Sequence, residues 1–138
     1  MKLQYTIPAD DFTRAWEASA AVTATLKRLG FPSETIRRVA IAMYEGEINM
    51  VIHASGGEAT VDIFPEKILM ELADNGPGIP DIDKAMTEGF STAPETARHL
   101  GFGAGMGLPN IKKYTDELTI HTELGKGTRL CMVVNVAQ

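Results

Sequence analysis

The first half of the chain shows one strand-like and two helix-like patterns of apolar and polar positions. Residues 2–7 alternate apolar with polar and predict a strand, which Pro8 ends. A helix is expected from a cap at Asp10 or Asp11 to about Leu29, since its apolar residues share one stripe. A longer helix is expected from residue 33 to about 54, where apolar residues again recur at helical spacing.

The second half contains strand-like runs on either side of a long irregular stretch. The strand-like runs lie at residues 59–64, 68–73, 118–122 and 128–136, and short turns join them into two hairpins. Between the hairpins, residues 74–107 are rich in Gly, Pro, Ser and Thr, and an irregular segment of about 34 residues is usually functional. Pro109 suits the first helical position of a short helix that runs to Tyr114.

These elements predict a single α+β domain over residues 1–138. Helices and strands would form a two-layer sandwich, with the helices on one face of a mixed, mostly antiparallel sheet. The chain has 138 residues, which is enough for a core without metal or disulfide bonds, and its one cysteine cannot form an intramolecular disulfide.

Charge and hydropathy narrow the classes of partner. The formal net charge of −5 argues against binding to the phosphate backbone of nucleic acids, which requires a basic surface. No apolar run approaches the roughly 20 residues needed to span a bilayer, and residues 1–10 lack a signal-peptide pattern. We therefore expect a soluble, cytoplasmic protein with neither nucleic acid nor membrane as a partner.

The first candidate site is on the second helix, where Glu45, Asn49 and His53 are four residues apart and share one face. A carboxylate can accept a proton from a hydroxyl or water, and an amide oxygen suits Mg²⁺. A solvated polar stripe would show the same spacing, and we expect His53 to be structural or solvated rather than catalytic. Glu47 is expected to face outward without a special role.

The second candidate is the segment Asp74-Asn75-Gly76-Pro77-Gly78-Ile79, which directly follows a strand. The glycines would let a ligand approach the backbone closely. An ionised carboxylate accepts hydrogen bonds only, which suits an exocyclic amino group such as that of adenine. An ordinary turn is the alternative, because Asn-Gly and Pro-Gly both favour turns.

The third candidate is the run Gly101-Phe102-Gly103-Ala104-Gly105-Met106-Gly107, which leads into the helix opened by Pro109. Backbone amides at a helix N-terminus favour phosphate oxygens. The spacing matches neither G-x-G-x-x-G nor a P-loop. A glycine hinge that binds no ligand is the alternative.

The order of these three motifs along the chain, from about Ile36 to Val134, resembles that of the GHKL superfamily. Members of this superfamily have the Bergerat ATP-binding fold. The resemblance implies ATP and Mg²⁺ as cofactors. It implies that Glu45 is the general base and that Asn49 binds the metal. It also implies that residues 82–107 form the ATP lid. The implied nucleotide-binding residues are Asn49, Asp74, Gly76, Gly78, Ile79, Gly103, Ala104, Gly105, Met106, Gly107, Leu108 and Thr128.

Within that superfamily, the chain length and the lid sequence look most like the small serine kinases of bacterial partner-switching pathways, of the RsbT, RsbW and SpoIIAB types. The resemblance implies a serine/threonine kinase that acts on an anti-sigma antagonist or STAS-domain protein. It also implies a sigma factor or downstream regulator as a further partner, and a homodimer as one oligomeric state. Two features depart from the pattern. The lid contains an additional segment at 93–100, and no basic residue directly precedes the glycine run, so Arg98 or Lys112 would have to replace it.

The main alternative is an ATP-gated binding module for a sigma factor or another partner, without catalysis. Hydrolysis coupled to another process is a third reading, less favoured because no transducing domain is recognised. Among the remaining residues, we expect His99 in the lid, His121 on an exposed strand face, Cys131 in the core and Trp16 in the core or at an interface. The scattered Cys and His residues give no support for a zinc site.

Overall fold

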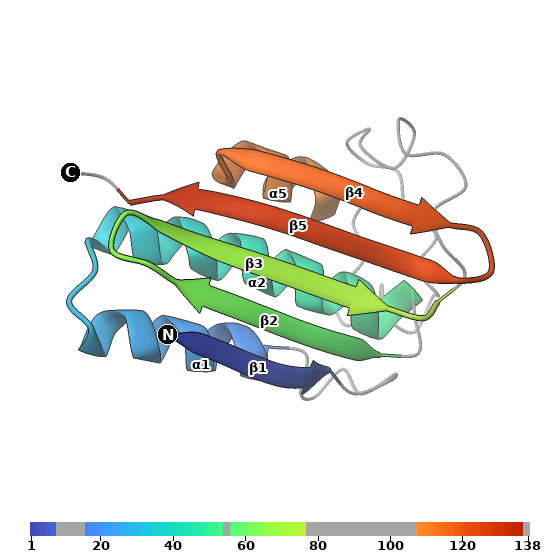
Figure 1. Cartoon of the computed structure of the whole chain (residues 1–138), viewed down its shortest axis with the longest axis horizontal. Helices are drawn as coiled ribbons and strands as arrows, with labels where there is room; N and C mark the ends of the chain where they lie inside the picture. Colours follow the sequence, from blue (N-terminus) through green and yellow to red (C-terminus); the bar gives the residue numbers. More distant parts are fainter. Residues whose placement is uncertain (8–15, 54–55, 77–106, 137–138) are drawn as a thin grey trace, which may run out of the picture.

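The computed structural model describes residues 1–7, 16–53, 56–76 and 107–136. Their strands form one five-stranded sheet in the order β1-β2-β3-β5-β4 (Figure 1). The strands are β1 (Lys2–Ile7), β2 (Gly57–Ile63), β3 (Lys67–Asp74), β4 (Glu117–Glu123) and β5 (Gly127–Asn135). All four pairings between these strands are antiparallel, so the described part of the expected mixed sheet is purely antiparallel.

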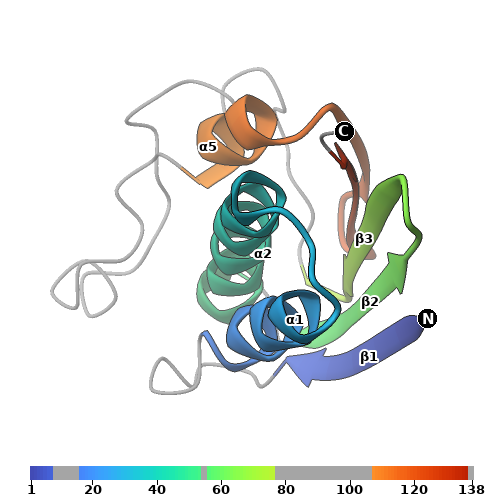
Figure 2. The same ribbon diagram turned by 90° about the vertical axis from the view of Figure 1, so that its left-hand side faces the viewer.

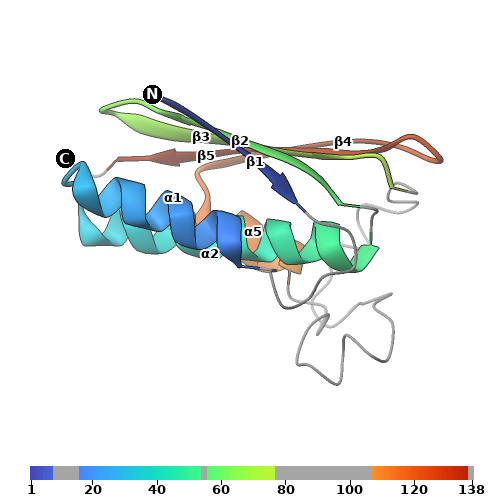
Figure 3. The ribbon, with the colours of Figure 1, turned by 90° about the horizontal axis from the view of Figure 1, so that it is seen from below.

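Among the described residues, three helices cover one face of the sheet, as the sequence predicted. They are α1 (Glu17–Arg28), α2 (Ser33–His53) and α5 (Gly107–Tyr114). Seen end-on, α2 lies between α1 and α5, with all three on the same side of the strands (Figure 2). Seen from below, α1 and α2 run beside one another beneath the sheet (Figure 3). The two-layer α+β architecture is therefore confirmed.

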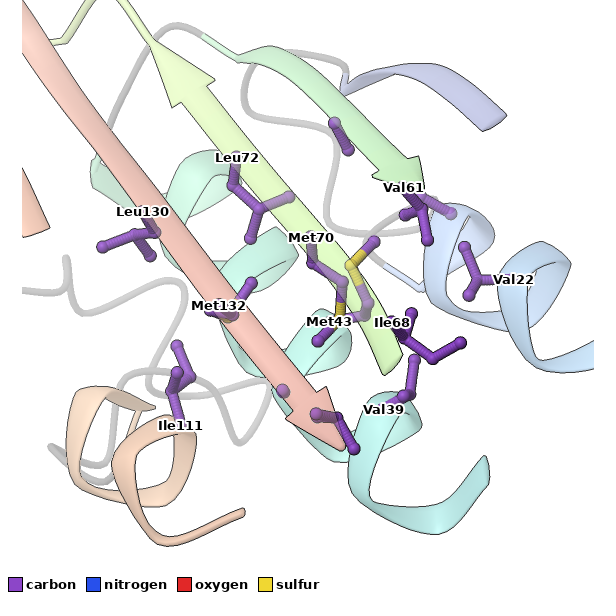
Figure 4. Packing of buried hydrophobic residues seen from close by; sticks show 14 of the residues in the cluster. Val22, Val39, Met43, Val61, Ile68, Met70, Leu72, Ile111, Leu130 and Met132 are labelled. Atoms are coloured by element: carbon purple, nitrogen blue, oxygen red, sulfur yellow. The ribbon is translucent and has the colours of Figure 1, made fainter. Parts of the chain in front are cut away.

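The core lies between the two layers and follows the alternation of the strands. In β2, Ala59, Val61 and Ile63 are buried while intervening residues are more exposed, which is the period expected of a sheet with one covered face. Val61 and the buried methionine Met70 face Val39, Met43 and the other apolar residues of the helices (Figure 4). Because α2 packs along the middle of the sheet, the packing fixes where its polar side chains lie relative to β3.

The boundaries of most elements agree with the sequence prediction, and the differences are local. The helix α5 begins at Gly107, two residues before the expected start at Pro109. Proline is tolerated there because the N–H groups of the first turn have no partner within the helix. The described part of the first helix begins after Trp16, and the expected caps Asp10 and Asp11 lie outside the described residues.

Of the two settings expected for Trp16, core or interface, the structure excludes the core, because its side chain is 48% exposed at the start of α1. The predicted core residue Cys131 is placed differently. Cys131 is half-buried, between the buried residues Leu130 and Met132 of β5. Since side chains alternate along a strand, Cys131 faces away from the helices. Partial burial nevertheless raises the pKa of its thiol. His121 is exposed, as expected.

No helix among the described residues is long and apolar enough to cross a bilayer.

Candidate nucleotide-binding and phosphotransfer site

Gly46 lets α2 lie close to the sheet beside the first candidate carboxylate. A Cβ at this position would overlap the side chain of Leu72 in β3 and would also reach Ile111 in α5. Both neighbours are fully buried and have little room to move. The absence of a side chain at Gly46 therefore allows α2, β3 and α5 to meet, and it fixes the adjacent Glu45 at this junction.

Glu45 and Asn49 lie one helical turn apart on α2, and both are half-buried. The Nδ2 atom of Asn110, in the first turn of α5, donates a hydrogen bond to Oε1 of Glu45 at 3.3 Å. This contact joins residues 65 positions apart and places the carboxylate against the start of the helix that follows the glycine run. The sequence pattern gave no signal for Asn110, because its partner is distant in the chain.

Asp74 ends β3, and its carboxylate is held by the backbone. Its Oδ1 atom accepts one hydrogen bond from the N–H of Gly76 at 2.8 Å and another from the N–H of Thr128 at 3.2 Å. Among the described residues, no hydrogen bond to its other oxygen is found. One oxygen is thus anchored, and the second can accept a hydrogen bond from a ligand.

Thr128 joins the same cluster from β5. Its hydroxyl lies 3.0 Å from that of Thr122, across the β4–β5 hairpin. The preceding residue, Gly127, has φ +123°, and a Cβ there would overlap the backbone carbonyl oxygen of Asp74. A residue with a side chain could not adopt this backbone at this distance. Gly127 therefore brings β5 against the end of β3 and completes the Asp74 site.

Glu47 is buried, contrary to the expectation that it faces outward. Its side chain is only 1% exposed. Oε2 accepts the N–H of Ala18 and Oε1 accepts the N–H of Ser19, both at 3.0 Å. These are the N–H groups that an N-cap side chain would normally bind, and Trp16 forms no such bond. A carboxylate from α2 thus caps α1 across the helix pair.

Burial raises the pKa of Glu47, and the nearby charge of Glu17 acts in the same direction. The hydrogen bonds from the two backbone N–H groups oppose that shift without cancelling it. Sequence periodicity could not reveal this role, since it depends on how α1 docks against α2.

The structure places six of the other expected site residues outside its described part: Gly78, Ile79, Gly103, Ala104, Gly105 and Met106. Gly107 and the buried Leu108 form the start of α5. Of the two suggested basic residues, Arg98 is outside the described residues and Lys112 is exposed on α5. The residues brought together are therefore Glu45 with Asn110, and Asp74 with Gly76 and Thr128.

The donor atoms of this region fit a hard cation and a nucleotide. The amide of Asn49 offers an oxygen ligand of the kind that Mg²⁺ accepts. The start of α5 adds backbone N–H groups and a helix dipole that favour phosphate oxygens. The second oxygen of Asp74, which accepts no hydrogen bond from the described residues, suits a donor such as an adenine amino group.

Comparison with known proteins supports this interpretation. The histidine kinase-like ATPase domain family matches residues 8–134. The serine/threonine-protein kinase RsbT of Bacillus subtilis is 34% identical over 110 residues, which are 75% of each chain. The anti-sigma F factor of Caldanaerobacter subterraneus is 35% identical over 120 residues, covering 83% of this chain and 80% of the relative.

Solved structures show the same fold at lower sequence identity. The RsbU and RsbW domains of Rv1364c from Mycobacterium tuberculosis superpose with a TM-score of 0.68 at 14% identity, and this chain spans 33% of that one. A chain of the SiaB-SiaC complex from Pseudomonas aeruginosa gives a TM-score of 0.64 at 13% identity, covering 96% of this chain and 88% of that one. The chain thus belongs to the histidine kinase-like ATPase domain family and, within it, to the serine/threonine kinases related to RsbT and the anti-sigma F factors.

Proposed function

We propose that this protein uses Mg·ATP to phosphorylate a serine or threonine of a small regulatory protein, of the STAS-domain or anti-sigma-antagonist type. The names of its relatives, a serine/threonine kinase and several anti-sigma F factors, support a partner-switching role. A sigma factor or a downstream regulator would be the second partner. The residue roles below are part of this proposal.

Adenine recognition is assigned to the end of β3. Asp74 is anchored through Oδ1 by the N–H groups of Gly76 and Thr128. Its second oxygen would accept the exocyclic amino group of adenine, and the buried Gly76 would allow the base to approach the backbone. The Thr122 and Thr128 hydroxyl pair provides further polar atoms at this edge.

The phosphates are assigned to the space between α2 and the start of α5. Asn49 would bind Mg²⁺, which neutralises phosphate charge when bound. The N-terminal N–H groups of α5 would hold phosphate oxygens, so the local positive field does not require a basic protein.

Glu45 is assigned as the general base. It would accept the proton of the acceptor hydroxyl while the hydroxyl oxygen bonds to the γ-phosphorus. The bond between the γ-phosphorus and the bridging oxygen breaks at the same time, and its electrons remain on ADP. Proton transfer to a positioned general base contributes about 10²- to 10⁴-fold to a rate.

The hydrogen bond from Asn110 to Glu45 is the observation that carries the proposal. It holds a carboxylate at the N-terminus of α5, where a phosphate would be bound. A negative group at that place repels phosphate, so a module that only binds ATP gains nothing from it. A base for phosphoryl transfer must lie there.

The test compares wild type with Glu45→Gln, using transfer of labelled γ-phosphate from Mg·ATP into proteins of a source-cell lysate. Glutamine keeps an oxygen that accepts the Asn110 hydrogen bond but cannot take the proton. We expect unchanged ATP affinity and loss of about 10²-fold or more of the transfer rate. Glu58→Gln on the exposed part of β2 is the matched control and should transfer normally.

Equal transfer by wild type and Glu45→Gln would remove Glu45 as the base. Intact ATP binding with no transfer by wild type would favour the ATP-gated binding module. Nucleotide-dependent partner capture would then be the next measurement.

A further inference from the structure

A groove of about 550 Å³ separates α1 from α2 on the solvent side of the helix pair. On α1 it is lined by Ala20, Thr23 and Ala24, which lie on a different side from the core residues Val22 and Leu26. In the end-on view α1 lies beside α2, and α5 lies on the opposite side of α2 (Figure 2). The groove therefore belongs to a helix face that the described strands and α5 do not cover.

The walls of the groove are small and largely apolar. Alanines at positions 20 and 24, one turn apart, face Ala40 of α2, and these short side chains leave the space open. Ile41 and the half-buried Tyr44 supply larger apolar surface on the α2 side. Such a surface can bury apolar side chains of a ligand.

The two ends of the groove are charged and of opposite sign. Glu45 lines one end. Lys27 lines the other end, is exposed, and forms no ion pair within the described part of the chain. The hydrogen bond from Ser19 to Glu47 shows which end of α1 lies near Glu45. From Ser19 to Lys27, eight helical residues give a length of about 12 Å.

Glu45 connects this groove with the nucleotide side. Its Oε1 atom accepts the hydrogen bond from Asn110 of α5, while the same side chain lines the groove between α1 and α2. A general base must lie about 2.6–3.2 Å from the hydroxyl whose proton it accepts. Because α5 occupies one side of Glu45, an acceptor hydroxyl would approach from the side of the groove.

We propose that this groove binds the acceptor segment of the protein substrate. This inference rests on the proposed kinase function. The segment carries its serine or threonine at the Glu45 end, an apolar residue between Ala24 and Ile41, and an Asp or Glu that pairs with Lys27.

We take the bound segment to be extended along the groove, whose two charged ends lie about 12 Å apart. At about 3.3 Å per residue, the acidic residue lies three or four positions from the acceptor hydroxyl.

The test measures transfer kinetics with the acceptor protein that wild type labels in the γ-phosphate assay. Lys27→Glu reverses the charge at the far end of the groove, and Ala24→Phe fills its middle at an exposed helical position. Arg28→Glu is the matched control, since it makes the same charge change at the next residue without lining the groove. ATP affinity and melting temperature are measured for each variant.

We expect Lys27→Glu and Ala24→Phe to raise the KM for the acceptor about tenfold or more, equal to 1.4 kcal/mol, with ATP affinity unchanged. Replacing the acceptor's acidic residue with Lys should restore a low KM for Lys27→Glu only. Arg28→Glu should resemble wild type.

Each other outcome overturns the inference. If both groove variants keep the wild-type KM for the acceptor, the groove does not bind the acceptor segment, and the kinase function is unaffected. Loss of a dimer in light scattering, without a change in KM, would assign the groove to a second copy of the chain. A fall in melting temperature without a change in KM would assign it to a segment of the same chain. If wild type labels no acceptor in the preceding γ-phosphate assay, the kinase function itself is refuted.

Discussion

The buried carboxylate of Glu47 gives a sharp test of how α1 is held against α2. Replacing it by leucine keeps a similar side-chain size, so the substitution leaves little cavity. It removes both acceptors for the N–H groups of Ala18 and Ser19, which lie at the buried start of α1. Water cannot readily replace them at a site where the side chain is 1% exposed.

The expected loss follows from those two N–H groups. Each buried donor left without a partner costs about 1–3 kcal/mol, which gives about 2–6 kcal/mol for the pair. The leucine offsets part of this, because burying the carboxylate is itself unfavourable, as the raised pKa of Glu47 indicates. We expect the free energy of unfolding to fall by about 2–3 kcal/mol and the melting temperature by about 7–10 °C, at about 2.1 cal/mol/K of unfolding entropy per residue.

Urea and thermal unfolding followed by circular dichroism would measure this change. Glu34→Leu is the matched control in the same helix, because Glu34 is exposed and forms a surface ion pair with Arg37 at 3.3 Å. Its cost should stay within about 0.5 kcal/mol. If Glu47→Leu were as stable as the Glu34→Leu control, or more stable than wild type, Glu47 would not be the cap that holds α1.

Three further predictions concern the same helix and the nucleotide site. Folding raises the pKa of Glu47, so the stability that this residue contributes is greatest below its unfolded pKa and is lost as pH rises through its folded pKa. In urea titrations, the free energy of unfolding of wild type minus that of Glu47→Gln should therefore fall over this pH interval. A rise would show that folding lowers the pKa of Glu47. Asp74→Asn keeps an oxygen for the N–H groups of Gly76 and Thr128 but places an amide donor toward the ligand. Calorimetry should therefore show that ATP binds about tenfold more weakly or worse, equal to 1.4 kcal/mol. Unchanged affinity would remove Asp74 from the adenine site. Gly46→Ala should lower the free energy of unfolding, measured with urea, by about 1–2 kcal/mol. Overpacking against Leu72 costs about 1–3 kcal/mol, and the better helix propensity of alanine returns up to about 1 kcal/mol. A net gain in stability would show that Leu72 moves aside.

Much of the fold could be predicted from local patterns. The strand Lys2–Ile7 and the helix Ser33–His53 were expected within a residue or two, because alternation and helical spacing are properties of short segments. Cys131 was misplaced, and Trp16 was left between the core and an interface, for a related reason. An apolar residue type indicates a preference for burial, but the packing of neighbouring elements determines which side of a helix or strand is covered.

The candidate site shows the same division. Glu45, Asn49 and Asp74 stood out as polar residues in distinctive local settings, and the structure gives Glu45 and Asp74 specific hydrogen-bond partners. Neither Asn110 nor Glu47 was assigned a role, because each acts on a residue far away in the sequence.

The sequence by itself determined the order of elements, the antiparallel hairpins and the motifs that place the chain among ATP-binding domains. Only the tertiary structure decided that Asn110 holds Glu45, that Glu47 caps α1, and that an open groove leads from Lys27 to Glu45. The physical reason is that local patterns depend on residues a few positions apart. Capping, burial and grooves instead depend on the distances between elements, which are set when the helices pack on the sheet.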